Sequence, residues 1–275
     1  MDNLSPLGNQ YASICLTPLL PRGDLSTAVT VGNTTIAAWL GERIQRDPIS
    51  SLVDNTALLV AKTAREVAHL HDYDTATHLD RMSSYARLIA TEGAALWGLT
   101  DEFIEYVFWF APLHDIGKVA VPHDILLKPG RLTDGEMTEM RLHVPKGVAI
   151  IDAITEAFGL DVLADISIAR NIIAFHHENV DGSGYPAGVT EDEIPIEGRI
   201  VAVADVFDAL TSERPYKQKW SNEDAVAEMH KQIGRKFDRD CVEALVSRLD
   251  DVIEIQNRFW SDSNFRPVRA YAAHQ

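Results

Sequence analysis

The sequence predicts an all-α protein, a helical bundle with a short N-terminal appendage. Three observations point to this class. From Ser51 onward, apolar residues recur at three- and four-residue spacing in one segment after another, the period of a helix with one buried face. Residues that cap helices stand at the ends of several of these segments. The 275-residue chain is 46% hydrophobic and 24% charged, which is ordinary for a soluble globular protein with one large domain.

The N-terminal region, residues 1–48, differs from the rest of the chain. It holds "TPLLPRG" and the β-leaning stretch "TAVTVGNTTIAAWL", and it stops at "RDPIS". We expect a short irregular or mixed appendage there, of unknown role. The main domain is predicted over residues 49–260, followed by a C-terminal tail over 261–275.

The first two helical segments of the main domain span residues 52–70 and 74–98. Their sequences are "LVDNTALLVAKTAREVAHL" and "DTATHLDRMSSYARLIATEGAALWG". Gly98 is a plausible C-cap, because glycine adopts the left-handed conformation that ends many helices. The apolar face of 52–70 could form the seam of a homodimer or pack within the molecule.

The next segments show N-terminal caps. "TDEFIEYVFWFAPLHDIGK", residues 100–118, begins with Thr100 or Asp101 as N-cap and continues into an apolar face. "TDGEMTEMRLHV" opens with a capping box that pairs Thr133 with Glu136. Both features predict helices.

Four further segments complete the series, giving a bundle of about eight or more helices. "RIVAVADVF" is the ambiguous one, since its β-branched residues also suit a buried strand. Its continuation through Asp208–Ala209–Leu210 favours a helix. The four segments are "LADISIARNIIAFHH", "PIEGRIVAVADVFDALTS", "SNEDAVAEMHKQI" and "DRDCVEALVSRL".

Charge and cysteine content exclude several functions. Forty-one acidic against 25 basic residues give a net charge of −16, which opposes DNA binding and requires local cations or metal for any phosphate ligand. Cys15 and Cys241 form no CxxC pair, so neither a disulfide framework nor a thiolate zinc site is expected. We expect a cytoplasmic protein with no membrane span, and "ASICLTPLLP" is a poor signal peptide.

Histidines and aspartates in or beside apolar helical segments suggest a metal centre. Any one of them could be a satisfied core histidine or half of an ion pair, but such residues are costly to bury without a partner. Nitrogen and oxygen ligands without sulfur suit iron, manganese, zinc or magnesium, and the number of histidines favours the transition metals. The candidate ligands are Asp74, His78, His114, Asp115, His143, His176, His177 and Asp205.

Spacing sharpens this hypothesis. Asp74 and His78 are four residues apart, so a helix presents both on one face. His176 and His177 are adjacent and can share a metal only if the helix ends there. The following "DGSGYP" ends it, because it contains two glycines and a proline.

Basic residues near these candidates could bind a phosphate. Lys118 follows Asp115 by three residues, and "SERPYKQKW" presents Arg214, Lys217 and Lys219 shortly after Asp205. The alternative is a solvated basic loop, which we prefer for Lys219.

These motifs together resemble the HD phosphohydrolase superfamily, and its HD-GYP subfamily more closely. A single His-Asp pair is a weak signal, but the ordered set is highly specific and covers roughly residues 60–247. The matching stretches are "THLDRM", "LHDIGKVAVPHDILLKPGRLT", "MRLHVPKG", "HHENVDGSGYPAG", "IPIEGRIVAVADVFDALTSERPYK" and "GRKFD".

The resemblance implies an HD-type helical bundle that hydrolyses cyclic di-GMP to linear pGpG, GMP or both through a metal-bridging hydroxide. It implies two or three divalent ions, often iron or manganese, with Asp115 as the bridge between them. By matching positions, His78, His114, Asp115 and Asp205 form the basic ligand set. His143, His176 and His177 hold a second metal, and Asp74 stands where three-metal members carry glutamate.

The resemblance also assigns substrate contacts. Lys118 and Arg214 would stabilise charge on the phosphate, and either Lys118 or a metal-bound water would protonate the leaving ribose oxygen. The GYP loop could also engage a signalling-protein partner. The positions that match substrate contacts are Lys118, Gly184, Tyr185, Pro186, Arg214 and Lys217.

The chain departs from the family pattern in several places. Asp74 is one methylene shorter than glutamate, which leaves a third metal open. Asn179 and Val180 replace an arginine and a large aromatic residue. In "HVPKG" the proline is displaced by one position, and Arg239 replaces a proline.

Two other functions remain open at the level of sequence. One is a cyclic di-GMP receptor or interaction module with little turnover, although the complete ligand set favours catalysis. The other is an HD hydrolase that acts on a mixed cyclic dinucleotide or on the linear product.

Overall fold

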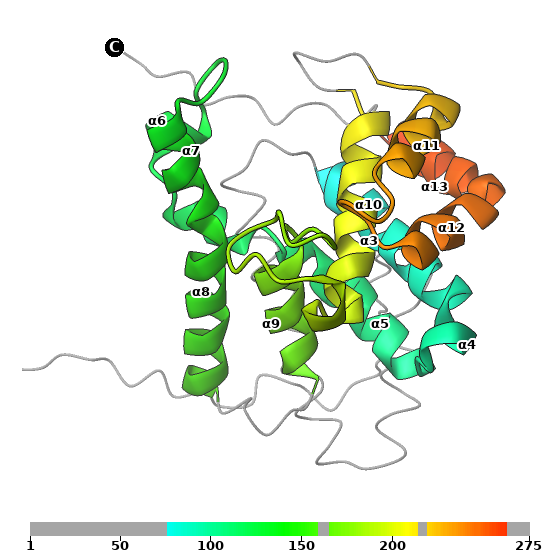
Figure 1. The fold of residues 1–275 in the computed structure, drawn as a ribbon, viewed down its shortest axis with the longest axis horizontal. Helices are drawn as coiled ribbons and strands as arrows, with labels where there is room; N and C mark the ends of the chain where they lie inside the picture. Colours follow the sequence, from blue (N-terminus) through cyan, green and yellow to red (C-terminus); the bar gives the residue numbers. More distant parts are fainter. Residues whose placement is uncertain (1–75, 159–164, 214–218, 263–275) are drawn as a thin grey trace, which may run out of the picture. The chain divides into compact units, whose positions relative to one another are not determined.

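The computed structural model describes residues 76–158, 165–213 and 219–262 (Figure 1). All of these belong to one unit of the chain, Leu52–Gln275. The predicted N-terminal appendage, the predicted helix over 52–70 and most of the predicted C-terminal tail lie outside the described residues. So do three candidate site residues, Asp74, Arg214 and Lys217.

The all-α prediction is confirmed over the described ranges, which contain helices and two isolated β-bridges. Short 3-10 helices occupy Ala111–Leu113 (η1), Ile116–Ala120 (η2) and Glu191–Glu193 (η4). The α-helices are α3 (Ala76–Glu92), α4 (Ala94–Trp97), α5 (Asp101–Phe110), α6 (His123–Leu126), α7 (Asp134–Arg141), α8 (His143–Phe158), α9 (Ile166–Phe175), α10 (Ile196–Thr211), α11 (Asn222–Lys231), α12 (Arg239–Ser247) and α13 (Leu249–Asp262).

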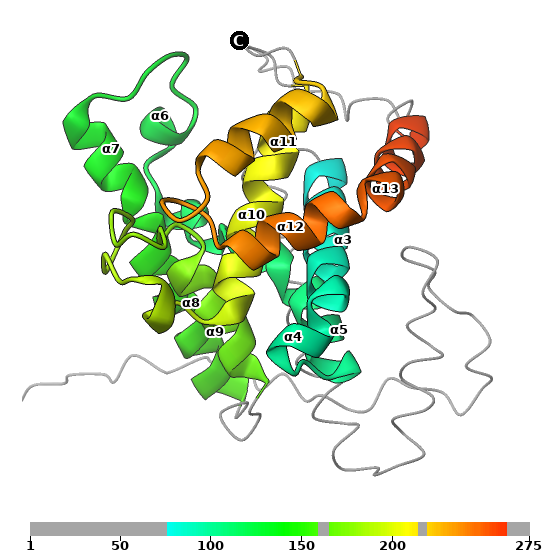
Figure 2. The same cartoon turned by 45° about the vertical axis from the view of Figure 1, so that its right-hand side comes forward.

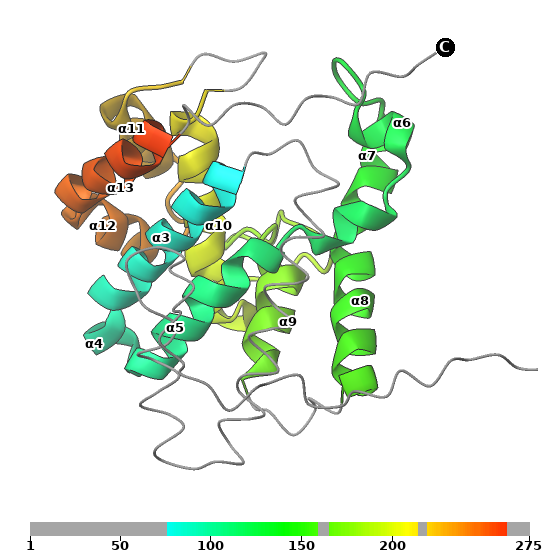
Figure 3. The same ribbon diagram turned by 180° about the vertical axis from the view of Figure 1, so that it is seen from behind.

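Helices α3 and α10 form the centre of the bundle. In Figures 1 and 3, α9 and α8 follow α10 on one side, while α12 and α13 pack against α3 on the other. Figure 2 shows α6 and α7 beyond one end of α8. The rings of Tyr85 on α3 and Phe207 on α10 meet edge to face at 5.3 Å, and both side chains are fully buried. Burying one such ring contributes about 1.5–3 kcal/mol.

No helix within the described ranges is long and apolar enough to cross a membrane.

Several sequence predictions of helix ends and helix type are confirmed. Thr100, rather than Asp101, caps α5, because its side chain accepts a hydrogen bond from the Phe103 amide. Thr133 and Glu136 form the predicted capping box of α7. Gly98 has a φ of 65°, in the left-handed region, but it closes the short helix α4, because the segment predicted over 74–98 is interrupted at Gly93. "RIVAVADVF" is helical within α10, and its strand-like composition follows from burial on most sides of that helix.

The segment 100–118 is not one continuous helix. Helix α5 ends at Phe110, and the chain continues as η1 and η2. Pro112 explains the break, because its nitrogen carries no hydrogen to continue the α-helical pattern. His114 and Asp115 therefore lie between two tight turns.

Helix α8 has no counterpart among the segments predicted to be helical. Pro145 lies in its first turn, where amide groups have no intrahelical acceptor and a proline costs little. The helix brings His143 into the bundle at its first residue.

A close approach between η2 and α8 depends on glycine. A Cβ atom at Gly117 would lie 1.8 Å from the carbonyl oxygen of His143 and 2.5 Å from the amide nitrogen of Gly147. Only a residue without a side chain allows this contact. It holds the turn that follows Asp115 directly against the start of α8.

Candidate metal centre

The structure brings seven of the eight predicted metal ligands together in two groups. Within each group, the nitrogen or carboxylate oxygen atoms that could bind a metal all lie within 4.8 Å of one another. The first group contains Asp115, His143, His176 and His177; the second contains His78, His114 and Asp205.

The first group comes from three elements. Asp115 precedes η2, His143 begins α8, and His176 is the C-cap of α9 with His177 directly after it. Oδ1 of Asp115 lies 3.2 Å from Nε2 of His143 and 3.8 Å from Nε2 of His176. The helix end expected at the paired histidines is thus present, and it allows both rings to face one group.

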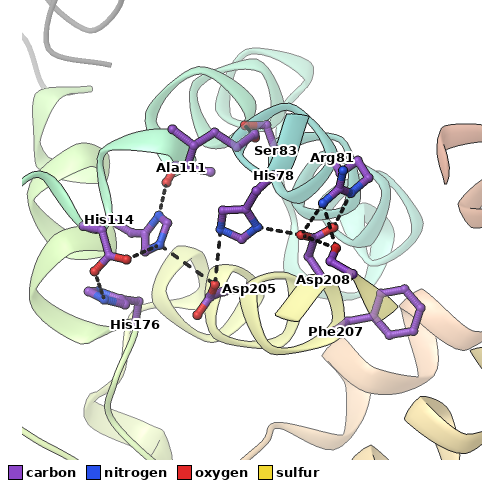
Figure 4. A network of polar contacts seen from close by, with 12 residues as sticks. His78, Arg81, Ser83, Ala111, His114, His176, Asp205, Phe207 and Asp208 are labelled. Carbon is purple, nitrogen blue, oxygen red and sulfur yellow. Dashed lines mark hydrogen bonds and ion pairs between the residues drawn. The ribbon is translucent and has the colours of Figure 1, made fainter. Parts of the chain in front are cut away.

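The second group joins α3, the η1–η2 turn and α10. Nε2 of His78 lies 3.8 Å from Oδ1 of Asp205, and Nε2 of His114 lies 4.0 Å from the same oxygen. Figure 4 shows the two imidazole rings and this carboxylate turned toward a common point.

Asp115 lies between the two groups. While Oδ1 faces His143 and His176, Oδ2 lies 3.1 Å from Nε2 of His114, a member of the second group. One carboxylate therefore presents an oxygen to each group, which is the placement that a bridging ligand needs.

Backbone carbonyl groups orient three of the histidines. Nδ1 of His114 lies 2.9 Å from the oxygen of Ala111, and Nδ1 of His143 lies 2.7 Å from that of Met140. Nδ1 of His176 lies near the oxygens of Ile172 and Ile173, at 3.1 and 3.0 Å. A carbonyl oxygen only accepts, so each Nδ1 donates and each Nε2 is turned toward the centre.

Within the described residues, four of the atoms turned toward the centre have no hydrogen-bond partner of acceptable geometry. They are buried, and burying such atoms unpaired is costly. Divalent cations bound at the two groups would satisfy these atoms, and their nitrogen and oxygen chemistry suits such ions. The residues present therefore fit divalent metal. The atoms are Nε2 of His114, His143 and His176, and Oδ1 of Asp115.

The pKa shifts in the first group favour the protonation states that can bind a metal, which are neutral histidine and ionised aspartate. Burial lowers the pKa values of His176 and His177, which keeps both rings neutral. Burial opposes ionisation of Asp115, but the charges of Lys118 and His114 outweigh it and hold the pKa well below the usual range.

His114 behaves differently. Burial opposes its charged form, but Asp115, together with Asp205, outweighs burial and raises the pKa of His114 to about 9. A metal that binds Nε2 must displace this proton, so binding at His114 releases one.

Lys118 lies at the edge of this centre. Its Nζ atom is 2.8 Å from Oδ2 of Asp115, and its position on η2, three residues after Asp115, fixes the contact. It is a cation placed directly beside a candidate bridging ligand.

The loop that contains Gly184, Tyr185 and Pro186 is attached to the first group. The Tyr185 ring stacks on His177 with centroids 4.6 Å apart, and the Tyr185–Pro186 peptide bond is cis. A Cβ atom at Gly184 would lie 2.3 Å from the Asn179 amide nitrogen, so this position requires glycine.

The side chain of Glu178 binds the backbone at the other end of this loop. The buried carboxylate accepts hydrogen bonds from the amides of Ala187 at 2.7 Å and of Gly188 at 3.0 Å. Asn179 donates to Ser183 at 2.9 Å, and Val180 is buried. The two residues that depart from the family pattern are therefore accommodated within the loop itself.

Sequence reasoning missed three residues near the centre. Arg141, two positions before His143, places its guanidinium 4.8 Å from the centroid of the Tyr185 ring. Asp208 is fully buried beside His78 and is bound by Arg81. The available signal was the spacing of Asp205 and Asp208, two carboxylates three residues apart in an apolar helix.

Comparison with known proteins identifies the family. The family model described as "HD domain" matches residues 52–241, and the chain belongs to the HD-domain family. The relatives below support the resemblance to the HD-GYP subfamily that the motifs indicated.

Three curated relatives illustrate the similarity. A cyclic di-GMP phosphodiesterase response regulator of Xanthomonas campestris, RpfG, is 41% identical over 208 residues, 76% of this chain and 52% of the relative. The 3'3'-cGAMP-specific phosphodiesterase 2 of Vibrio cholerae is 38% identical over 211 residues, 77% of this chain and 37% of the relative. A cyclic di-GMP phosphodiesterase of Thermotoga maritima is 38% identical over 192 residues, 70% and 49% of the two chains. The chain thus spans about half or less of the length of these relatives.

Proposed function

We propose that this protein is a metal-dependent phosphodiesterase that hydrolyses cyclic di-GMP to linear pGpG, GMP or both. The observation that carries the proposal is the position of Asp115. Its two carboxylate oxygens face separate groups of imidazole nitrogens, and four buried atoms there have no hydrogen-bond partner in the part of the chain that the structure describes. The names of the curated relatives support the reaction class.

We propose that each of the two groups binds one metal ion and that Asp115 is a ligand of both ions. Asp74 remains a proposed additional ligand from the sequence alone. Divalent ions, when bound, supply Lewis-acid stabilisation of phosphate charge and lower the pKa of a coordinated water. The histidine-rich donor set favours a transition metal, and we propose iron or manganese because the resemblance to the HD-GYP subfamily implies them.

The residues of the chain would position and neutralise the substrate. The Lys118 ammonium would face a non-bridging phosphate oxygen or donate a proton to the leaving ribose oxygen. Burial and the charge of Asp115 raise the pKa of Tyr185, so its phenol stays a hydrogen-bond donor at neutral pH. Gly184 and Pro186 would shape the loop around that ring, and Arg214 and Lys217 are proposed phosphate contacts.

A second candidate substrate is a mixed cyclic dinucleotide. Relatives of similar identity include proteins named as 3'3'-cGAMP-specific phosphodiesterases. Both candidates present the same phosphodiester to the same centre, so the distinction lies in recognition of one base. A cytoplasmic location, a homodimer and a signalling partner at the GYP loop remain predictions from the sequence.

Purification without chelator, metal analysis and incubation with cyclic di-GMP would test the proposal. We expect at least two divalent ions per chain and release of linear dinucleotide or GMP. The Asp115→Ala variant should abolish turnover, because it removes the shared ligand. Asp152→Asn, which alters an exposed ion pair with Arg170 on α8 and α9, is the matched control and should retain activity.

Three outcomes would separate the alternatives. Tight binding of cyclic di-GMP with substoichiometric metal and no turnover would support a receptor instead. Turnover of a mixed cyclic dinucleotide alone would support the second substrate. Unchanged activity in Asp115→Ala would overturn the proposed centre.

A further inference from the structure

Four of the five candidate ligand histidines are held through Nδ1, and they are held in two different ways. His114, His143 and His176 each donate from Nδ1 to a carbonyl oxygen three or four residues earlier in the chain. Nδ1 of His78 instead lies 2.5 Å from Oδ2 of Asp208, which is 130 residues away on α10. Figure 4 shows this contact on the side of the His78 ring that faces away from Asp205.

Asp208 is held rigidly by other groups. The side chain of Arg81 donates from Nε to Oδ1 at 2.7 Å and from Nη2 to Oδ2 at 3.0 Å. Ser212 donates to Oδ2 at 3.0 Å and also accepts a hydrogen bond from Arg81 at 2.7 Å. The planar guanidinium thus fixes the plane of the carboxylate through a bidentate contact.

Helical spacing explains why these groups meet. His78 and Arg81 are three residues apart on α3, and Asp208 and Ser212 are four apart on α10, so each pair lies on one helix face. Asp205, on the same side of α10 as Asp208, faces Nε2 of His78. Helix α10 therefore contacts both ring nitrogens of a single imidazole.

The donors around Asp208 define the role of the contact. Arg81 donates to both carboxylate oxygens and Ser212 donates to one of them, so the carboxylate is surrounded by donors and acts as an acceptor. The proton of His78 therefore stays on Nδ1, and Nε2 keeps its lone pair for a metal. The carboxylate also makes that lone pair more basic.

We propose that Asp208, fixed by Arg81 and Ser212, is a positioning residue that holds His78 as a metal ligand in the second group. The inference rests on the proposed metal-dependent function. It adds that metal affinity at the second group depends on the packing of α3 against α10 through His78, whereas His143 and His176 of the first group are oriented by local carbonyls.

Metal binding to Asp208→Asn, measured without any nucleotide, tests this proposal. Asparagine has the same shape, but it carries no charge and its amide opposes the donors of Arg81. Using Mn²⁺ as the probe, with chelator competition and metal analysis, we expect about 10- to 100-fold weaker binding of one ion per chain. Binding at the first group should be retained.

Asp238→Asn is the matched control. Asp238 is also a buried carboxylate bound by an arginine, Arg199, at 2.6 Å, but it caps α12 and contacts none of the seven candidate ligands that the structure describes. We expect this variant to lose thermal stability and to keep its affinity for Mn²⁺. Equal loss of Mn²⁺ affinity in both variants would reduce Asp208 to a structural role and overturn the proposal.

Ser212→Ala keeps the test decisive if Asp208→Asn does not fold. It removes one donor to Oδ2 and leaves the Arg81 contact, so a smaller loss of affinity, confined to one ion, is expected. Wild-type affinity and stoichiometry in the folded Asp208→Asn or Ser212→Ala protein would overturn the positioning role alone. A wild-type protein that binds no Mn²⁺ would overturn both this role and the proposed metal dependence.

Discussion

At the scale of single residues, the site places groups that can bind a metal next to a cation. Imidazole nitrogens and carboxylates converge on the centre, and one lysine lies at its edge, 2.8 Å from Asp115. Replacing Asp115 tests the ligand set, whereas replacing Lys118 tests what the protein does to the substrate beside it.

Lys118→Met should lower turnover by about 10²–10³-fold, because it removes a preorganised cation from the developing phosphate charge. Metal content should stay at the wild-type level, since the ligands remain. Steady-state kinetics and metal analysis on the same preparation measure both quantities. Lys231→Met is the control, because Lys231 forms only an exposed ion pair with Glu228 on α11.

Metal loss in Lys118→Met would contradict this assignment. It would mean that the ammonium acts chiefly by keeping Asp115 ionised. Unchanged turnover would remove Lys118 from the proposed mechanism altogether.

At the scale of elements, formation of the first group depends on the close packing of η2 against the start of α8. Asp115 directly precedes η2, and His143 is the first residue of α8. Their approach depends on Gly117, whose missing side chain leaves room for the His143 carbonyl.

Gly117→Ala should destabilise the fold by about 1–3 kcal/mol, because a new methyl group collides with backbone that cannot move aside. It should also weaken metal binding by separating Asp115 from His143. Thermal unfolding and Mn²⁺ binding measure the two effects. At Gly135 a Cβ atom meets nothing within 4 Å, so Gly135→Ala in α7 should be neutral or stabilising by up to about 1 kcal/mol.

An equal response of the two variants would contradict this account. The loss would then reflect a general effect of replacing glycine rather than the contact at η2.

Local signals predicted some of these elements correctly, whereas prolines and glycines were misjudged in others. The capping box at Thr133 and the helix end at His176 are set by residues within one turn, and both could be predicted. The break after Phe110 was missed, although Pro112 is visible in the sequence. Helix α8 was missed because proline and glycine near its start obscured the apolar period that follows.

In the candidate site, what could be predicted depended on distance in the sequence. Seven of the candidate ligands lie together in two groups, and each is part of a motif that can be recognised by itself. Asp208 and Arg81 act only through a contact between helices distant in the sequence, and no local pattern reports that contact. Arg141 was missed for the same reason, since its relation to Tyr185 depends on how α7 and the loop pack.

At the scale of the whole molecule, metal binding and folding should be coupled, because the ligands come from α3, α8, α9, α10 and the turns between them. An ion that binds only the folded chain, at a free concentration 100 times its Kd, stabilises it by about 2.7 kcal/mol. Removing metal with a chelator should therefore lower Tm by about 5–10 °C. Added Mn²⁺ should restore it.

Asp115→Ala provides the comparison for this experiment. The variant should unfold at a lower temperature than the wild type, and chelator should change its Tm much less. A Tm of the wild-type protein that does not respond to chelator or Mn²⁺ would show that metal contributes nothing to folding.

The two groups of ligands also differ in when they can be completed during synthesis. Every member of the first group lies between residues 115 and 177, so a growing chain contains all four before α10 has been made. The second group includes His78, near the start of the domain, but it is incomplete until Asp205 has been synthesised. The contact that orients His78 requires Asp208, which follows Asp205. Since chains emerge from the N-terminus, the order of the sequence itself sets an order of maturation. The long-range link from His78 to Asp208 makes the second group the late step.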